Sequence, residues 1–300
     1  MTESQKGNIF IVVEMIIWSL FPVVSLLGFK GMPSTVSLFW VNLFSTIFFL
    51  VVMIFKNKWH ELRNKYLWYY ILGVVIFVCV IFYSLFFYAL TMTVPTNAAI
   101  VVLFEIVTSY IFFQIVKKES LDSRHIFGIV LAIIGTLIVL LPNFNGIHTG
   151  DLIIIFATFF TPFGNWCQQQ ARKIASTETT LFLRHLLTIP FLFIIIHFLG
   201  FSLKVESIKS VIGWLLLNGI FIFGFSKILW VEAIHRMSVT KALAINSLNP
   251  IFTILFSWFL LSQLPTMVQF ISLPFLIIAI FILTDFNFNN FTLLNNGVKK

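Results

Sequence analysis

Ten long apolar runs, separated by short polar or charged links, limit most strongly how this chain can fold. Each has about the 20 residues that a helix needs to cross the hydrocarbon core of a bilayer. A backbone in lipid must satisfy its own hydrogen bonds, and the runs lack the alternation of a β-barrel. We therefore expect an all-α membrane protein with ten transmembrane helices. The runs cover residues 8–28, 35–55, 67–89, 95–116, 124–141, 151–170, 180–201, 211–232, 239–261 and 267–284.

The composition fits a chain whose solvent is lipid. Hydrophobic residues make up 59% and charged residues 10% of the chain, against about 25% charged residues in ordinary soluble domains. The formal net charge of +8 does not indicate a nucleic-acid partner, because the basic residues lie in the short links. The two cysteines, Cys79 and Cys167, lie inside apolar runs, so we expect no disulfide, no metal site and no cofactor.

The spacing of breaks in residues 89–141 returns 144 positions later without a gap, which indicates an internal duplication. Ala89 aligns with Ala233 and Glu105 with Asn249. Each copy would hold five helices, and an odd number makes the second copy enter the membrane from the opposite side. We expect two inverted five-helix repeats and a disordered cytoplasmic tail. Their boundaries are 1–145, 146–285 and 286–300.

The positions of the basic residues predict the orientation. If both termini are cytoplasmic, the cytoplasmic segments hold 14 of the 19 Lys and Arg residues, and the outer links hold only Lys30, Lys204 and Lys209. This bias is typical of cytoplasmic loops. We therefore expect a multi-pass protein with both ends in the cytoplasm.

Four charged residues stand out because they lie at bilayer depth, inward of the ends of the apolar runs: Glu14, Glu105, Arg184 and Lys227. A charge at this depth is costly unless it faces a partner or a wet cavity. Glu14, Arg184 and Lys227 share a depth, so Glu14 is free to pair with either cation. Glu105 has no cation at its level. It is either a substrate or coupling acid that exchanges a proton, or a protonated carboxyl bonded to a neighbouring helix.

Each of the other candidate residues also has two interpretations. Arg184 with His185 would contact an anionic group, or Arg184 would extend to the cytoplasmic interface, as Lys227 also would. Trp18 and Trp166 lie in the first span of each half beside a proline, which favours a cavity position over packing. Asn249 would contact a ligand or join two helices.

Three prolines predict broken helices at matched places. Pro22 and Pro162 lie in the first span of each half, and Pro250 follows Asn249 in the ninth span. Proline removes a backbone donor and frees a carbonyl group, and broken helices in two halves of a transporter point to a central site. No enzyme motif such as Gly-x-Ser-x-Gly, a phosphate loop or His-Glu-x-x-His occurs, so we expect no catalytic activity.

The chain resembles the EamA family of the drug/metabolite transporter (DMT) superfamily over about residues 8–285. The resemblance lies in residues 93–98 at the head of the fourth span, Lys118-Glu119 at its close, Leu248-Asn249-Pro250, and Arg184 early in the second helix of a repeat. Two features depart from the family pattern: Ile106 follows Glu105 where proline is usual, and Val41-Asn42 stands at the place of Arg184.

The resemblance implies a secondary transporter of the bacterial cytoplasmic (inner) membrane. Its central cavity would bind a small-molecule substrate, such as an amino acid, a derivative of one or a drug-like solute, with the proton as a possible coupling ion. An exporter is the first expectation. Uptake or exchange of a host-derived metabolite, and a membrane scaffold or embedded enzyme, are the alternatives. The oligomeric state is not readable from the sequence.

Overall fold

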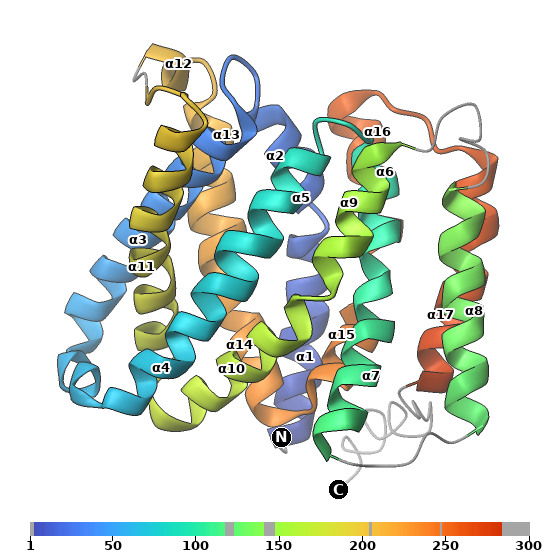
Figure 1. Cartoon of the computed structure of the whole chain (residues 1–300), viewed down its shortest axis with the longest axis horizontal. Coiled ribbons are helices and arrows are strands. Elements are labelled where there is room, and N and C mark those ends of the chain that lie inside the picture. Colours follow the sequence, from blue (N-terminus) through green and yellow to red (C-terminus); the bar gives the residue numbers. More distant parts are fainter. Residues whose placement is uncertain (1–2, 118–122, 141–147, 204–205, 247, 284–300) are drawn as a thin grey trace, which may run out of the picture.

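The computed structural model describes residues 3–117, 123–140, 148–203, 206–246 and 248–283, and this part of the chain contains helices and no strand (Figure 1). The expected tail, residues 286–300, lies outside the described residues, as do the expected boundary at 145/146 and the Lys118-Glu119 pair. The helical class agrees with the sequence, because lipid favours elements that satisfy their own backbone groups.

The helices up to residue 140 include one π-helical segment, η2, and two 3₁₀ segments, η1 and η3. Their bounds are α1 Glu3–Trp18, α2 Phe21–Gly28, α3 Ser34–Lys56, η1 Trp59–Arg63, α4 Lys65–Val74, η2 Val75–Phe82, α5 Tyr83–Ala89, α6 Pro95–Val101, η3 Val102–Phe104, α7 Glu105–Lys117 and α8 Ser123–Leu140.

The helices from residue 149 onward include a second π-helical segment, η5. Their bounds are α9 Thr149–Thr158, α10 Thr161–Ile174, α11 Thr177–Phe198, α12 Glu206–Lys209, α13 Ile212–Leu216, η5 Leu217–Ser226, α14 Lys227–Arg236, α15 Val239–Asn246, α16 Asn249–Leu261 and α17 Met267–Leu283.

Within the part of the chain that the structure describes, six helical segments are long and apolar enough to cross a membrane by length and composition. They agree with six of the ten expected spans, and the protein is a multi-pass membrane protein. The remaining expected spans correspond to shorter helices or to helices next to residues outside the described part. The six segments are Gln5–Gly28, Ser34–Lys56, Lys65–Ala89, Pro95–Ile115, Thr177–Phe198 and Ile212–Arg236.

Helices from the two halves of the chain pack against one another throughout the bundle. α3 lies along α11, α8 lies along α17, α1 contacts α14, and α4 contacts α10. In Figure 1, α8 and α17 stand together at one end of the molecule, and α3 and α11 lie at the other end. The interior between these ends is filled by large side chains such as Phe21, Phe86 and Phe223, which are buried. The cavity described below lies among them.

The helix breaks predicted from proline are confirmed. α1 and α2 are separated at residues 19–20, and α9 and α10 at residues 159–160. Pro22 and Pro162 each lie in the first two positions of the helix that follows the break, and Pro250 does the same in α16. Proline suits this position because the first backbone N–H groups of a helix have no intrahelical partner.

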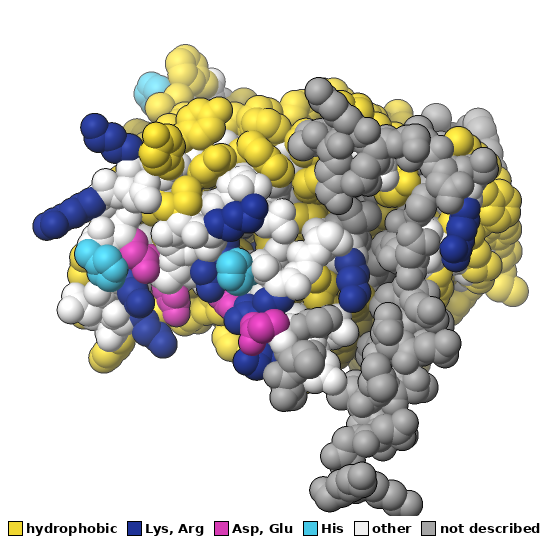
Figure 2. All heavy atoms as spheres, turned by 90° about the horizontal axis from the view of Figure 1, so that it is seen from below, with side chains coloured by type: hydrophobic (Ala, Val, Ile, Leu, Met, Phe, Trp, Pro, Cys, Tyr) yellow, Lys and Arg dark blue, Asp and Glu magenta, His cyan; other side chains and the backbone are white. Residues whose placement is uncertain are grey.

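The face that carries the N-terminus also carries a polar cluster that joins four helices. Arg172 of α10 donates to Glu232 of α14 at 3.1 Å, Thr177 of α11 bonds the same carboxylate, and Arg236 contacts both Glu232 and Glu3. Figure 2 shows Lys, Arg, Asp and Glu side chains gathered on this face. These bonds tie α1, α10, α11 and α14 together at one end of the bundle.

Candidate functional site

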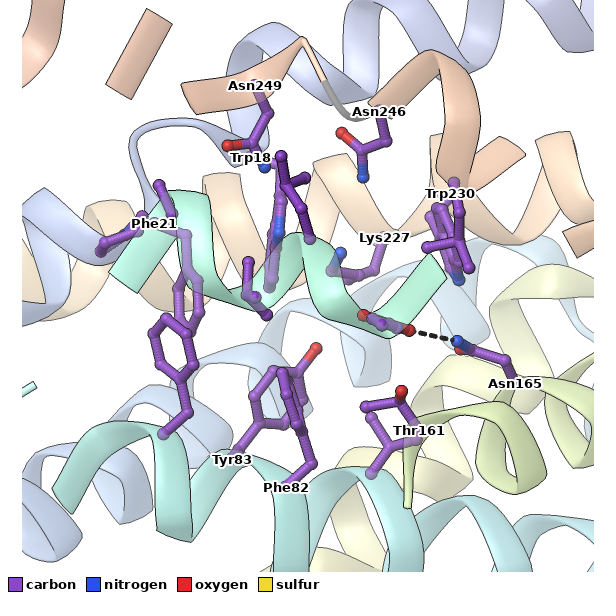
Figure 3. A pocket seen from close by; sticks show the side chains of 18 of the residues that line it. Trp18, Phe21, Phe82, Tyr83, Thr161, Asn165, Lys227, Trp230, Asn246 and Asn249 are labelled. Atoms are coloured by element: carbon purple, nitrogen blue, oxygen red, sulfur yellow. Dashed lines mark hydrogen bonds between the residues drawn. The ribbon is translucent and has the colours of Figure 1, made fainter. Parts of the chain in front are cut away.

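A cavity lies where the broken helices of both halves meet (Figure 3). Its volume is about 80 Å³, room for several waters at about 10–15 Å³ each, or for part of a small metabolite. Aromatic, amide and charged side chains share its wall, which therefore offers both apolar and polar contacts. The lining residues are Trp18, Phe21, Pro22, Val78, Phe82, Tyr83, Phe86, Ala99, Val102, Leu103, Glu105, Ile106, Thr161, Asn165, Arg184, Lys227, Trp230, Leu243, Asn246 and Asn249.

Residues at the first position of a helical segment supply several polar groups of this wall. Glu105 is the first residue of α7, Lys227 the first of α14 and Asn249 the first of α16. Thr161 begins α10 after the break at 159–160. At the break before Thr161 the first backbone N–H groups of α10 lack intrahelical partners, so a polar cavity there costs less than one lined by continuous helices.

Lys227 and Glu14 form a buried ion pair. Lys227 Nζ donates to Glu14 Oε1 at 2.9 Å, and Ser226 Oγ donates to the same oxygen at 3.3 Å. The ammonium group also lies 3.2 Å from the centroid of the Trp18 ring, a cation–π contact. The structure therefore selects Lys227 as the partner of Glu14, and the alternative in which Lys227 extends to the interface is wrong.

Glu105 is held by neutral donors. Asn165 Nδ2 donates to Glu105 Oε1 at 2.9 Å, the bond drawn as a dashed line at Asn165 in Figure 3. No Lys or Arg in the described part of the chain forms a salt bridge with this carboxyl group. Glu105 is only partly buried and lines the cavity, so a bound solute or a proton is able to reach it.

Arg184 is a buried cation without an acidic partner among the described residues. Only 2% of it is exposed, so it does not extend to the interface, and that alternative is wrong. Its guanidinium donates to Gln168 Oε1 at 3.3 Å and to the Tyr83 hydroxyl at 3.4 Å, and its Nε has no hydrogen-bond partner. A guanidinium is suited to bind a carboxylate through two parallel bonds, and this one lines the cavity.

An aromatic wall faces these charges. Trp18 stacks on Phe21 with ring centroids 4.3 Å apart, and Phe21 stacks on Phe86 at 5.0 Å. Tyr83 lies 6.3 Å from Trp18 and presents its hydroxyl to Arg184. A solute in the cavity would thus meet flat apolar surface on one side and polar groups on the other.

Besides Glu14, which is fully buried behind Lys227, two of the expected site residues do not line the cavity. Trp166 packs edge-on against Tyr70, with ring centroids 5.9 Å apart, and contacts Phe163. His185 stacks on Phe49 and bonds Asn42, with 2.9 Å between Nδ1 and Oδ1. Both predictions used depth and neighbours in the sequence, but each side chain points from its helix towards another packing contact.

Tyr83 and Asn165 also belong to the site, although neither was among the site residues expected from the sequence. Tyr83 precedes Lys227 by 144 positions, the offset of the internal repeat, and both residues directly follow a π-helical segment. Applying the offset to each buried charge would have found Tyr83. Asn165 has no such signal, because its role depends on the contact between α10 and α7.

Comparison with known proteins identifies the family. The model of the EamA-like transporter family matches residues 5–141 and again residues 148–285. This chain belongs to that family. The EamA family is part of the drug/metabolite transporter superfamily, a group of membrane transporters.

One relative and one solved structure are similar to this EamA protein. An "Uncharacterized transporter" of Archaeoglobus fulgidus is 26% identical over 200 residues, which are 64% of this chain and 61% of the relative. This chain therefore spans about three fifths of that relative. A solved crystal structure is similar over 93% of this chain and 96% of its own, with a TM-score of 0.70 at 15% identity, a likeness of fold alone.

Proposed function

We propose that this protein is a secondary active transporter that moves a small metabolite across the membrane by alternating access. The observation that carries the proposal is that helices broken at matched places in both halves end at one cavity with buried charges. Transporters with repeated halves build their substrate sites from such discontinuous helices near the middle of the bilayer. The cavity would open to each side in turn as the halves rock against each other.

The proposed architecture has ten transmembrane helices in two inverted repeats, residues 1–145 and 146–285. The π-helical segments η2 and η5 both lie in the third span of their half, and the 3₁₀ segment η3 before Glu105 lies at the place of the interval between α15 and α16 before Asn249. Asn42 and His185, which bond each other, are 143 positions apart, as expected for equivalent residues beside a two-fold axis. The contacts of α3 with α11 and of α8 with α17 follow the same rule.

The proposed substrate is an amino acid, a derivative of one or a drug-like solute. Arg184 offers a guanidinium with a free Nε for a carboxylate, and Glu105 offers an acid held only by neutral donors. Trp18, Phe21 and Phe86 would pack on the apolar part of the solute. Glu105 is the proposed site at which a proton is exchanged for coupling.

For direction, we propose export from the cytoplasm of a bacterium across its inner membrane, with both termini cytoplasmic. The charged face in Figure 2 supports this orientation, because it carries the N-terminus and many Lys and Arg side chains. Uptake or exchange of a host-derived metabolite is the second candidate, since the cavity has no feature that sets direction. Counterflow from preloaded vesicles distinguishes the two.

Transport by purified protein in liposomes tests the proposal. Amino acids, nucleotide derivatives and cationic dyes are offered as substrates, and Glu105→Gln and Arg184→Ala are compared with the parent. We expect flux of one substrate class that each variant reduces at least about tenfold, the effect of losing a buried charge-assisted contact of about 1.4 kcal/mol or more. Flux of no substrate, or variants as active as the parent, would contradict the proposal and favour a scaffold. A membrane-embedded enzyme would instead convert the offered compound.

A further inference from the structure

The ammonium group of Lys227 sits in a complete cation-binding site supplied by other helices. Glu14 of α1 contributes a carboxylate oxygen at 2.9 Å, and the Trp18 ring centroid lies at 3.2 Å. Trp230 adds a second ring at 5.6 Å. A carboxylate together with an aromatic face is the environment that recognises organic ammonium ions. The protein thus places its own cation where a cationic solute would bind.

Lys227 separates this acid from the cavity. Lys227, Trp18 and Trp230 line the cavity, whereas Glu14 is 0% exposed and is not a lining residue. The second carboxylate oxygen of Glu14, Oε2, has no hydrogen-bond partner in the described part of the chain. The acid is therefore neutralised on its cavity side by Lys227, and it retains capacity for a further donor.

The other two charges of the cavity do not share this pair. Glu105 accepts from Asn165, and Arg184 donates to Gln168 and Tyr83. Glu14 forms its ion pair with Lys227 rather than with Arg184. Removing the charge of either Glu14 or Lys227 would therefore change the net charge that the pair presents to a solute.

We propose that Lys227 is a tethered cation that fills a site for primary alkylammonium groups formed by Glu14 and Trp18, and thereby excludes organic cations from the cavity. The inference rests on the proposed function only in taking this cavity as the solute site. Loss of the Lys227 side chain would expose the Glu14 carboxylate and the Trp18 ring to the cavity. Loss of the Glu14 charge would leave an unpaired ammonium there and favour an anion.

Binding to the purified full-length protein in detergent tests the first half. Calorimetry with n-butylammonium, which resembles the lysine side chain, is run on the parent, Lys227→Ala and Lys227→Arg, with n-butanol as the neutral probe. We expect Lys227→Ala to bind n-butylammonium at least about tenfold more tightly than the parent, a gain of about 1.4 kcal/mol or more. Lys227→Arg, which keeps a tethered cation, should behave as the parent, and n-butanol should bind none of them.

The double variant Glu14→Gln/Lys227→Ala is the matched control, because it opens the same space without the acid. It should show no gain for n-butylammonium. Equal n-butylammonium binding by the parent and Lys227→Ala would overturn the proposal, as would a full gain in the double variant. Both results would mean that the Glu14–Lys227 pair does not set the charge preference of the cavity.

Glu14→Gln tests the second half and decides the question if Lys227→Ala does not fold with its acid unpaired. We expect this variant to bind 3-phenylpropionate at least about tenfold more tightly than the parent, and phenethylammonium no better. Unchanged binding of 3-phenylpropionate would overturn the proposal. Absence of transport in liposomes with the charge switch intact would refute the proposed transport and leave this inference standing.

Discussion

Among single residues, Asn42 and His185 are buried polar side chains that depend on each other for a hydrogen-bond partner. Asn42 Nδ2 donates to the Leu38 carbonyl at 2.9 Å, so its Oδ1 is an acceptor and His185 Nδ1 is the donor. Both side chains are fully buried, and His185 Nε2 has no hydrogen-bond partner. Asn42 therefore satisfies the ring N–H of His185, which is buried away from water. Loss of the Asn42 side chain would leave this buried donor without a partner.

The substitution Asn42→Ala is expected to destabilise the protein by about 1–3 kcal/mol, the cost of one unsatisfied buried group. Thermal unfolding in detergent measures the effect. His185→Ala and the double variant complete a cycle, in which a true pair makes the two losses less than additive. Strict additivity would show that the contact between α3 and α11 does not depend on this bond.

At the scale of elements, close helix approach depends on glycine where two backbones meet. A Cβ on Gly219 would lie 2.8 Å from the Val41 carbonyl oxygen and 2.8 Å from Phe44 Cβ. Ser45 Oγ donates to the Gly219 carbonyl at 2.7 Å, which fixes η5 against α3. The π-helical segment is therefore packed backbone to backbone, and the position of Lys227 after it depends on this contact.

Gly219→Ala should lower the free energy of unfolding by about 1–3 kcal/mol, because backbone atoms cannot move aside as a flexible side chain would. Gly213→Ala in α13 of the same span is the control. Its Cβ would have no neighbour within 4 Å, and alanine is the better helix former by about 0.5–1 kcal/mol. Unfolding midpoints that fall equally in both variants would argue against the close approach.

The start of α11 is capped by an acid from the other half of the chain. Glu61 Oε2 accepts from the Ser176 backbone N–H at 2.8 Å and from its hydroxyl at 2.7 Å. Partial burial raises the pKa of Glu61, but hydrogen bonds from Thr179 and Ser176 outweigh it and hold the pKa below its usual value. An acid at a helix N-terminus is also favoured by the helix dipole.

This cap predicts a pH dependence. A carboxyl group with a lowered pKa stabilises the folded state above its ordinary value, and the contribution disappears as the pH falls below about 4. Glu61→Gln should thus be less stable than the parent by about 1 kcal/mol or less at pH 7, since the group is largely solvated. The difference should close in acid. A difference in unfolding midpoint that is the same at pH 7 and pH 3 would contradict this role.

At the scale of the whole molecule, the orientation in the membrane is the property most open to test. Single cysteines at the exposed positions Lys30 and Arg63 are predicted to lie on opposite sides. A membrane-impermeant maleimide added outside intact cells should label Lys30→Cys only, and Arg63→Cys after permeabilisation. The native Cys79 and Cys167 are buried and should remain unlabelled. Labelling of both new cysteines from outside would exclude the proposed topology.

The order of residues was enough to show that this is a helical membrane protein, where prolines interrupt its helices, and which four charges lie at bilayer depth. These are local properties: a span needs about 20 apolar residues, and a proline such as Pro250 removes a donor wherever it stands. The offset of 144 positions that aligns Glu105 with Asn249 can likewise be read from the sequence. Both residues are the first of an α-helix and line the cavity.

Which of these groups come into contact depends on how the helices pack in the folded protein. Depth in the membrane allowed Glu14 to pair with either Arg184 or Lys227. The packing of α1 against α14 brings it to Lys227. The same choice of helix face placed Arg184 at the cavity and turned His185, the next residue, towards Asn42. Adjacent helical residues point about 100° apart, and the facing direction of each helix is set by all of its neighbours together.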